Sequence, residues 1–249
     1  MNLGNTHHTS MEDIFSKPVL SAPVLASQPA SYLEPAKVVL PDGRKATIYA
    51  FFRTNDEKDI EVSLPGGKNK ILPAEDVDRL IAVLWKLLNR EIEGGRTYPQ
   101  WDTLSFIDFR NYWFILFTAV IILDESSGEL DLTFKNAEEL ALGTFYVKPN
   151  YPGRCGHVCN AGFLVSDKFR GQKIGKTLGA QYVKWAPQLG YTSSIFNLVF
   201  ETNIASQKIW DGLGFEKVGR VKKAAWVKGL EERGPVDAII YSYDFTKDQ

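Results

Sequence analysis

The chain has 249 residues, 44% of them hydrophobic, which is enough to bury the core of one large domain or two small ones. A formal net charge of −1 and a pI near 6.3 exclude a general electrostatic affinity for nucleic acid. The N-terminus lacks the basic and apolar regions of a signal peptide, and the most apolar run, 112–123, is too short to span a membrane. We therefore expect a cytoplasmic protein, with the nucleus and the mitochondrion as alternatives, that binds neither nucleic acid nor membranes.

Residues 1–30 are rich in Ser, Pro, Ala and Thr and show little periodicity, which predicts a flexible N-terminal arm. The rest of the chain, 31–249, contains strand-like runs interrupted by helical patterns, and it shows no internal repeat. This organisation predicts a single mixed α/β domain.

The chain has two cysteines, Cys155 and Cys159. If both lay in one strand, their Cα atoms would be roughly 13 Å apart, which is too far for a disulfide. Together with His157 they offer three possible metal ligands, but no second ligand cluster follows. We therefore expect no metal site.

Two strands are predicted over 37–40 and 46–52, joined by a Pro-Asp-Gly turn. The polar segment 55–70 is predicted to be a loop. The strongest helical pattern starts at Pro73 and stops at the glycine pair 94–95. Its apolar face, expected to lie on the sheet, comprises Val77, Leu80, Ile81, Leu84, Leu87, Leu88 and Ile92.

The middle of the chain is predicted to hold an aromatic loop over 97–101, a short helix over 103–109 and a central strand over 113–123. The aromatic loop either packs on the surface by its own side chains or forms one wall of a binding site. An acidic loop is expected over 124–139, and a further strand over 140–148.

A strand over 157–165 and the loop Arg170-Gly171-Gln172-Lys173-Ile174-Gly175 organise the second half of the chain. The loop opens a helix that Pro187 is expected to end or kink. Glycines let the backbone approach a ligand, and a helix N-terminus presents unpaired N–H groups and the positive end of the helix dipole. The loop therefore predicts a phosphate site. The inner face of the helix is predicted to comprise Ile174, Leu178, Tyr182 and Trp185.

The remaining elements are a strand over 194–200, a short helix that starts at Asn203 and stops at Gly214-Phe215, and strands over 216–221 and 237–245. The order strand, Arg-Gly-x-x-x-Gly loop, helix, strand and Asn-x-x-Ser…Gly-Phe resembles the two core motifs of the GNAT superfamily of N-acetyltransferases. The usual loop of that superfamily has a glycine where Lys173 stands. The resemblance implies the GNAT fold, a central mixed, largely antiparallel, twisted β-sheet flanked by helices, with acetyl-CoA as the cosubstrate.

A closer resemblance runs from about residue 73 to the end and includes loops and aromatic positions, as in 88–100, 142–151, 159–165 and 235–241. These stretches are similar to the yeast and fungal proline-analogue acetyltransferases, which N-acetylate azetidine-2-carboxylate. The Lys in place of the middle loop glycine also looks like this family. The resemblance implies a homodimer that acetylates small cyclic imino acids such as L-azetidine-2-carboxylate and cis-4-hydroxyproline. Its implied role is detoxification of proline analogues and protection against oxidative stress.

The GNAT resemblance also implies how the cosubstrate binds. Backbone N–H groups at the end of the 157–165 strand would bind pantetheine and the developing oxyanion, and those of the loop would hold the pyrophosphate. The lysines and the arginine of the loop would add positive charge. The predicted cofactor-binding residues are Phe163, Leu164, Val165, Arg170, Gly171, Gln172, Lys173, Ile174, Gly175, Lys176, Asn203 and Ser206.

The family resemblance implies that two asparagines carry the chemistry, Asn160 as a substrate-binding and catalytic residue and Asn197 as a catalytic residue. The amide of Asn160 offers both an acceptor and two donors, which suits an imino acid. Asn197 lies mid-strand in an otherwise apolar run, where a buried amide without a hydrogen bond costs roughly 1–3 kcal/mol. Either could instead be a hydrogen-bonded structural amide. Asn203 is predicted to cap its helix, and the resemblance implies that its amide also binds pantetheine.

Trp210 stands where many GNAT enzymes have a tyrosine that serves as the general acid. The indole N–H is not a useful acid, and a thiol with a pKa near ~8.5 can leave without full proton transfer, so we expect no dedicated acid. Glu201 and His157 are the candidate general bases.

Three functions stay open from the sequence. The leading one is a small-molecule N-acetyltransferase; the others are a protein or histone N-acetyltransferase and an acetyl-CoA-binding module without turnover. A basic cluster is either a solvated surface or a contact for the 3′-phosphate of CoA or for an acidic partner. It comprises Lys217, Arg220, Lys222, Lys223 and Lys228.

Overall fold

A computed structural model describes residues 30–54, 59–125 and 130–247, so the predicted arm lies outside the described residues except for Ala30. The strands are β1 (Ala36–Val39), β2 (Lys45–Arg53), β3 (Ile60–Leu64), β4 (Lys68–Leu72), β5 (Phe117–Leu123), β6 (Ala141–Pro149), β7 (Val158–Val165), β8 (Ser193–Phe200), β9 (Glu216–Ala225) and β10 (Val236–Asp244). The helices are α2 (Ala74–Gly94), α3 (Phe106–Trp113), α4 (Ala137–Leu140), α5 (Ile174–Gln188) and α6 (Ile204–Gly212).

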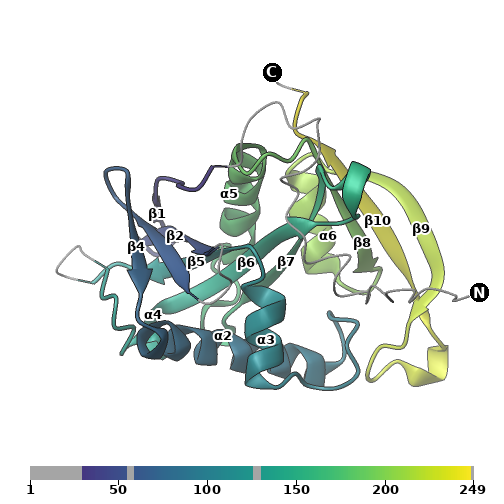
Figure 1. Cartoon of the computed structure of the whole chain (residues 1–249). Helices are drawn as coiled ribbons and strands as arrows, with labels where there is room; N and C mark the ends of the chain where they lie inside the picture. Colours follow the sequence, from purple (N-terminus) through teal and green to yellow (C-terminus); the bar gives the residue numbers. More distant parts are fainter. Residues whose placement is uncertain (1–29, 55–58, 126–129, 248–249) are drawn as a thin grey trace, which may run out of the picture.

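The strands form one twisted sheet in the order β4-β3-β2-β5-β6-β7-β8-β10-β9, with β1 paired to β2 (Figure 1). Neighbours are antiparallel except β7 and β8, which run parallel. That parallel pair is short, since its register holds only Val158 with Ser193 and Cys159 with Ser194. Beyond these residues β7 and β8 diverge, and we call this divergence the splay.

Helices cover both faces of the sheet, with α5 and α6 on one side and α2, α3 and α4 on the other (Figure 1). The seven predicted inward residues of α2 are all buried, and so are the four predicted for α5. Each stripe packs into a separate apolar core, one per face. The mixed, largely antiparallel α/β architecture expected from the sequence is therefore confirmed.

The prediction that 55–70 is a loop was wrong. Part of it lies outside the described residues, but the rest forms β3 and the start of β4, joined at a turn where Gly66 and Gly67 have φ of 81° and 77°. The segment looked polar because β4 is the edge strand of the sheet and exposes four of its five side chains. Burial of Ile60 and Val62 against α2 holds the hairpin in place.

Other boundaries differ by a few residues. The helix predicted over 103–109 instead runs from Phe106 to Trp113 and is capped by Ser105. It therefore includes the first residue of the strand predicted over 113–123, and that strand begins only at Phe117. Pro187 lies in the last turn of α5, where little helix remains for it to disrupt. β9 is longer than predicted, because it continues to Ala225. α4 is an additional helix within the predicted acidic loop, part of which is not described.

The two cysteines do not share a strand. Cys155 ends a short 3₁₀ turn, Gly153–Cys155, whereas Cys159 is buried in β7, and both thiols are free. In the described part of the chain, no group of three His, Cys, Asp or Glu residues is arranged to hold a metal ion.

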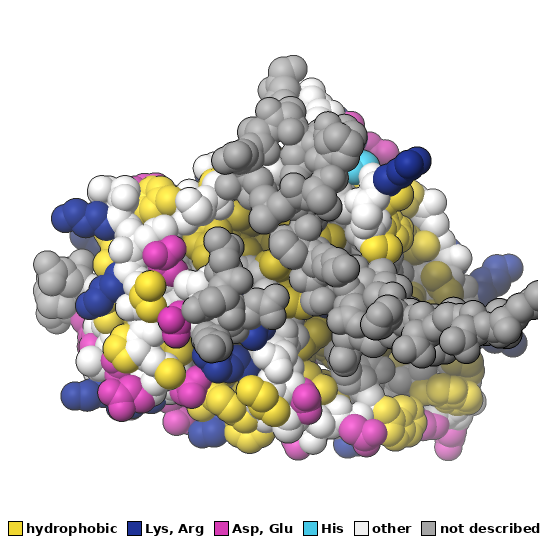
Figure 2. Space-filling view, viewed as in Figure 1, with side chains coloured by type: hydrophobic (Ala, Val, Ile, Leu, Met, Phe, Trp, Pro, Cys, Tyr) yellow, Lys and Arg dark blue, Asp and Glu magenta, His cyan; other side chains and the backbone are white. Residues whose placement is uncertain are grey.

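Figure 2 shows acidic and basic side chains interspersed over the part of this face that grey atoms do not cover. This mixture agrees with a formal net charge of −1. Of the described helices, none has the length and hydropathy needed to cross a membrane.

Candidate active site at the splay

Backbone hydrogen bonds show which groups of β7 face the splay. Asn150 N donates to Val158 O on the β6 side, whereas Thr192 N donates to His157 O on the β8 side. Because backbone groups alternate in direction along a strand, those of Phe163 and Val165 point toward β8. The backbone of Leu164 points toward Thr144 of β6, its register partner.

This alternation separates the three predicted strand residues. Phe163 and Val165 can offer N–H groups to a ligand at the splay, but Leu164 contributes a side chain to the α2 core instead. The carbonyl of Phe163 already accepts a hydrogen bond of 3.0 Å from the Tyr98 hydroxyl. The aromatic loop 97–101 therefore reaches the edge of β7.

Aromatic side chains fill the splay on the α5 side. Trp210 of α6 packs on Phe163 of β7 and on Phe196 of β8, with ring centroids 4.9 and 4.5 Å apart. Its indole N–H donates to Ser206 Oγ at 2.8 Å. Trp210 thus holds the two diverging strands together. This packing explains why a large aromatic side chain stands at this position, although its N–H is not acidic.

Three asparagines meet across the splay on the opposite side. Asn160 Nδ2 donates to Asn150 Oδ1 at 3.1 Å and to the Ile195 carbonyl at 3.0 Å. Asn197 Nδ2 donates to the same Asn150 Oδ1 at 2.6 Å. Asn160 and Asn197, which lie far apart in sequence, are therefore brought together, and Asn150 links them.

The sequence did not single out Asn150 as a site residue. It follows β6 in a Pro-Asn-Tyr-Pro segment that was interpreted only as the end of a strand. An asparagine flanked by prolines outside a regular element is a weak signal by itself, and its role became visible only through its partners on β7 and β8.

The predicted phosphate loop has the backbone of a glycine-rich loop even at Lys173. Lys173 adopts φ 61° and ψ 14°, the left-handed conformation that glycine favours, and Gly171 has φ 80°. The lysine thus preserves the path of the missing glycine, at a cost in strain of roughly 1–3 kcal/mol. No described side chain caps the N-terminus of α5, so its first N–H groups are available to an anion.

The side chains of the loop divide into paired and unpaired groups. Arg170 forms ion pairs with Glu91 and, at 2.8 Å, with Asp167. Gln172 accepts from Arg44 at 2.9 Å. Lys173 and Lys176 are exposed and form no ion pair with any described residue, so these two lysines can supply positive charge to a phosphate.

Gly175 serves helix packing as well. A Cβ there would lie 3.0 Å from Ile209 of α6 and 3.7 Å from Val165, so the glycine lets α5 approach both elements. Asn203 caps α6 as predicted, because its Oδ1 accepts from Ser206 N at 3.1 Å. The amide Nδ2 of Asn203 has no partner among the described residues and can still donate.

The two candidate bases lie in different settings. Glu201 pairs with Arg220 at 3.0 Å, which ties up its carboxylate. His157 has a buried Nδ1 without a partner in the described part of the chain, but it precedes β7 and lies outside the asparagine cluster. Two side chains of the basic cluster are also engaged, since Lys217 pairs with Asp211 at 3.1 Å and Lys228 Nζ donates to the Glu93 carbonyl at 3.0 Å.

A cavity of about 20 Å³, lined by residues such as Tyr49, Leu80 and Phe134, lies between α2, α4 and the end of β5. It has room for about one water molecule and does not include residues of the splay.

The comparison with protein families matches residues 85–215 to the acetyltransferase (GNAT) family. N-acetyltransferase aca1 of Schizosaccharomyces pombe is 41% identical over 181 residues, which cover 71% of this chain and 86% of that protein. Protein SPT10 of Saccharomyces cerevisiae is 32% identical over 67% of this chain, but the match covers only 31% of SPT10. The chain therefore belongs to the GNAT family and is an acetyltransferase.

Solved structures agree on the fold. A GCN5-related N-acetyltransferase from Kribbella flavida superposes with a TM-score of 0.57 at 27% identity, covering 69% of this chain and 94% of that chain. YncA of Salmonella typhimurium, solved with acetyl-CoA, gives a TM-score of 0.53 at 12% identity over 68% of this chain and 91% of that chain. At that identity the second likeness establishes the fold alone.

Proposed function

We propose that this protein transfers the acetyl group of acetyl-CoA to the ring nitrogen of small cyclic imino acids such as L-azetidine-2-carboxylate and cis-4-hydroxyproline. The observation that carries the proposal is the cluster of Asn150, Asn160 and Asn197 across the splay. The resemblance to fungal proline-analogue acetyltransferases supports the choice of acceptor, and the relative aca1 is itself named an N-acetyltransferase.

The described residues fit acetyl-CoA. The uncapped N-terminus of α5 and the unpaired Lys173 and Lys176 suit a pyrophosphate, and Asn203 Nδ2 suits an amide carbonyl. The backbone N–H groups of Phe163 and Val165 face the splay, where an oxyanion hole requires donors. When bound, acetyl-CoA supplies the reactive thioester.

The asparagine cluster would orient the acceptor amine. Asn197 is exposed, and among the described residues its Oδ1 accepts only one hydrogen bond, a long one of 3.3 Å from Asn150 Nδ2, so it can also accept from an amine N–H. Asn160 is anchored to the Ile195 carbonyl, and its own Oδ1, which has no partner in the described part of the chain, can accept from the same ligand. Such orientation lowers the barrier by holding the nitrogen where it can attack.

Thiol release from acetyl-CoA tests the function, with azetidine-2-carboxylate, proline, spermidine and a histone-tail peptide as acceptors. We expect release with the four-membered imino acid and little with the other three. Release with the peptide alone would make the protein a protein N-acetyltransferase. If the protein binds acetyl-CoA but releases no thiol with any acceptor of a wider panel, it is an acetyl-CoA-binding module without turnover.

The variant Asn197→Ala tests the role of the cluster. We expect kcat to fall by about 100-fold, since an amide that contacts the reacting group contributes about 1.5–3 kcal/mol. Binding of acetyl-CoA, measured by calorimetry, should change little. Equal loss of binding and turnover would make Asn197 a folding residue.

We also propose a homodimer that detoxifies proline analogues and protects against oxidative stress in the cytoplasm. Its support is the family resemblance. Light scattering of the full chain would give the mass directly, and growth on azetidine-2-carboxylate with and without the gene would test the role.

A further inference from the structure

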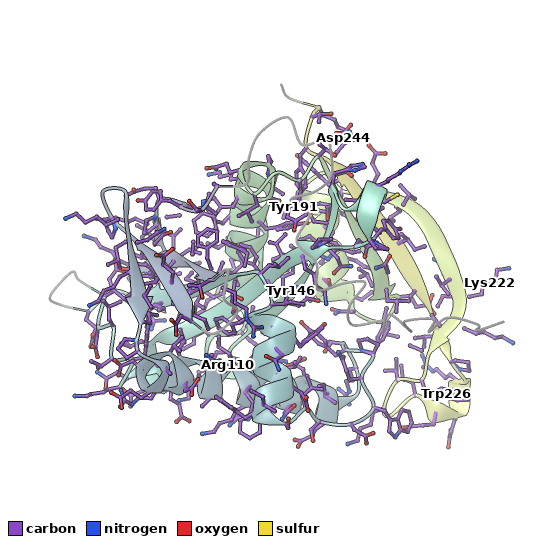
Figure 3. All side chains as sticks on the ribbon, in the orientation of Figure 1. Arg110, Tyr146, Tyr191, Lys222, Trp226 and Asp244 are labelled. Atoms are coloured by element: carbon purple, nitrogen blue, oxygen red, sulfur yellow. The ribbon has the colours of Figure 1, made fainter. Side chains whose placement is uncertain are left out.

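Lys148 lies beside the asparagine cluster. In the register of β6 and β7, Lys148 is the partner of Asn160, and cross-strand partners project from the same face of a sheet. Tyr146, two residues earlier in β6, projects from that face as well and lies near the centre of the molecule in Figure 3. The ammonium group is therefore placed on the acceptor side, away from α5.

Two tyrosines hold the ammonium group. Lys148 Nζ lies 4.4 Å from the ring centroid of Tyr112 and 5.1 Å from that of Tyr146. The two hydroxyls are 2.9 Å apart, which locks the rings together. Tyr146 also occupies the space that a side chain at position 162 would need, since a Cβ on Gly162 would lie 2.4 Å from its ring. The position of the charge is thus fixed by packing.

The charge of Lys148 has no counter-ion in the described part of the chain. No described carboxylate forms an ion pair with it, in contrast to Arg170, which has two. Burial raises the pKa of both tyrosines, so neither phenol is negative near neutral pH. Burial also lowers the pKa of Lys148. A partly buried cation without a counter-ion is costly, and an anionic ligand would remove that cost.

The same wall holds an unpaired acceptor. Gln100, from the aromatic loop, lies beside Tyr112, and its Oε1 is buried and has no donor among the described residues. Buried polar groups without partners are uncommon, and they point to a group that is missing from the free protein. A hydroxyl or N–H group of a bound ligand would satisfy it.

We propose that Lys148 binds the carboxylate of the acceptor and makes the site selective for amines that stand next to a carboxylate. Gln100 Oε1 accepts from a hydroxyl of the same small molecule where the acceptor carries one, as in cis-4-hydroxyproline. A second ammonium group in the acceptor, as in polyamines or lysine-rich peptides, is repelled by Lys148. This inference deepens the proposed function and rests on the acceptor binding on the α2 and α3 face.

The test compares azetidine-2-carboxylate with its neutral carboxamide as acceptors of the wild type and of Lys148→Met, which keeps an apolar stem. We expect kcat/KM for the carboxylate to fall about 10- to 100-fold, mainly through KM, because a charged hydrogen bond is lost. The carboxamide should change less than about threefold, since it makes no ion pair. Lys148→Arg should recover part of the activity, and Lys184→Met, an exposed lysine on α5, is the matched control.

Equal losses with both acceptors would overturn the role of Lys148. If the wild type acetylates another carboxylate-bearing amine but no imino acid, the proposed acceptor fails while the selectivity stands. If it acetylates only amines without a carboxylate, both fail. If no acceptor turns over, calorimetry of the carboxylate and the carboxamide with the CoA-loaded protein decides, and equal or absent binding overturns the proposal.

Discussion

At the scale of single residues, Asn150 is the side chain on which the asparagine cluster depends. Its Oδ1 accepts from both Asn160 and Asn197, so one amide sets the distance between two strands that are not paired at this level. The cluster is polar and partly exposed, and it adds little to the apolar cores. Its residues therefore affect activity more than stability.

We predict that Asn150→Ala lowers kcat/KM by about 10- to 100-fold, since two amides lose a shared partner. The midpoint of thermal unfolding should move by no more than a few degrees. Asn136→Ala, which removes an exposed asparagine near α4, should leave activity unchanged. Wild-type activity in Asn150→Ala would show that the cluster is not needed.

The two thiols should react very differently. Burial raises the pKa of Cys159 to about 12, and its Sγ lies 3.0 Å from the Tyr182 hydroxyl. The thiolate is the reactive form, so at about pH 8 Cys159 stays protonated and inert, whereas Cys155 is exposed. Iodoacetamide followed by mass spectrometry should label Cys155 alone in the native protein and both cysteines in denaturant. Labelling of native Cys159 would contradict its burial.

At the scale of elements, the contact between α5 and α6 decides how the splay is built. Gly179 of α5 is buried against α6, where a Cβ would lie 2.7 Å from Leu213 and 3.2 Å from Trp210. Trp210 in turn packs on both diverging strands. A small change at this helix contact is therefore transmitted to β7 and β8.

We predict that Gly179→Ala destabilises the protein by about 1–3 kcal/mol, because overpacking forces Leu213 or Trp210 to move. Gly212→Ala is the matched control, since nothing lies within 4 Å of a Cβ there. It should be neutral or stabilising by up to about 1 kcal/mol, as expected for alanine in a helix. Urea unfolding of both variants gives the free energies, and equal destabilisation would refute the packing argument.

At the scale of the whole molecule, the site depends on segments from distant parts of the chain. The β9–β10 connection is tied to the end of α2, because Lys228 N donates to Gly95 O, and Trp226 marks this connection in Figure 3. The α5 N-terminus and the asparagine cluster lie on either side of the splay. A ligand that contacts several of these parts should stabilise the molecule as a unit.

We predict that CoA at about 100 times its dissociation constant stabilises the fold by about 2.7 kcal/mol. For a domain of this size, that corresponds to a rise of roughly 5–10 °C in the unfolding midpoint. Gly171→Ala should reduce the rise, because its φ of 80° is unfavourable for alanine, although the added Cβ meets no atom within 4 Å. No thermal shift with CoA would count against cosubstrate binding at the loop.

The sequence by itself determined most of the elements and the family. Local signals were sufficient: the 3.6-residue stripe of α2, the cap at Asn203, and the loop Arg170 to Gly175 followed by a helix. Where the local signal was weak, as in the polar edge strand β4, the prediction failed. This segment forms a strand because it pairs with β3, and its own hydrophobic pattern does not indicate one.

Only the tertiary structure decided how the site residues relate to one another. The link from Asn150 to two strands, the left-handed backbone of Lys173 and the tyrosines around Lys148 all depend on sheet register and on contacts across the chain. A sequence pattern reports on neighbours a few positions away. A site assembled from diverging strands is defined by residues whose separation in sequence carries no such information.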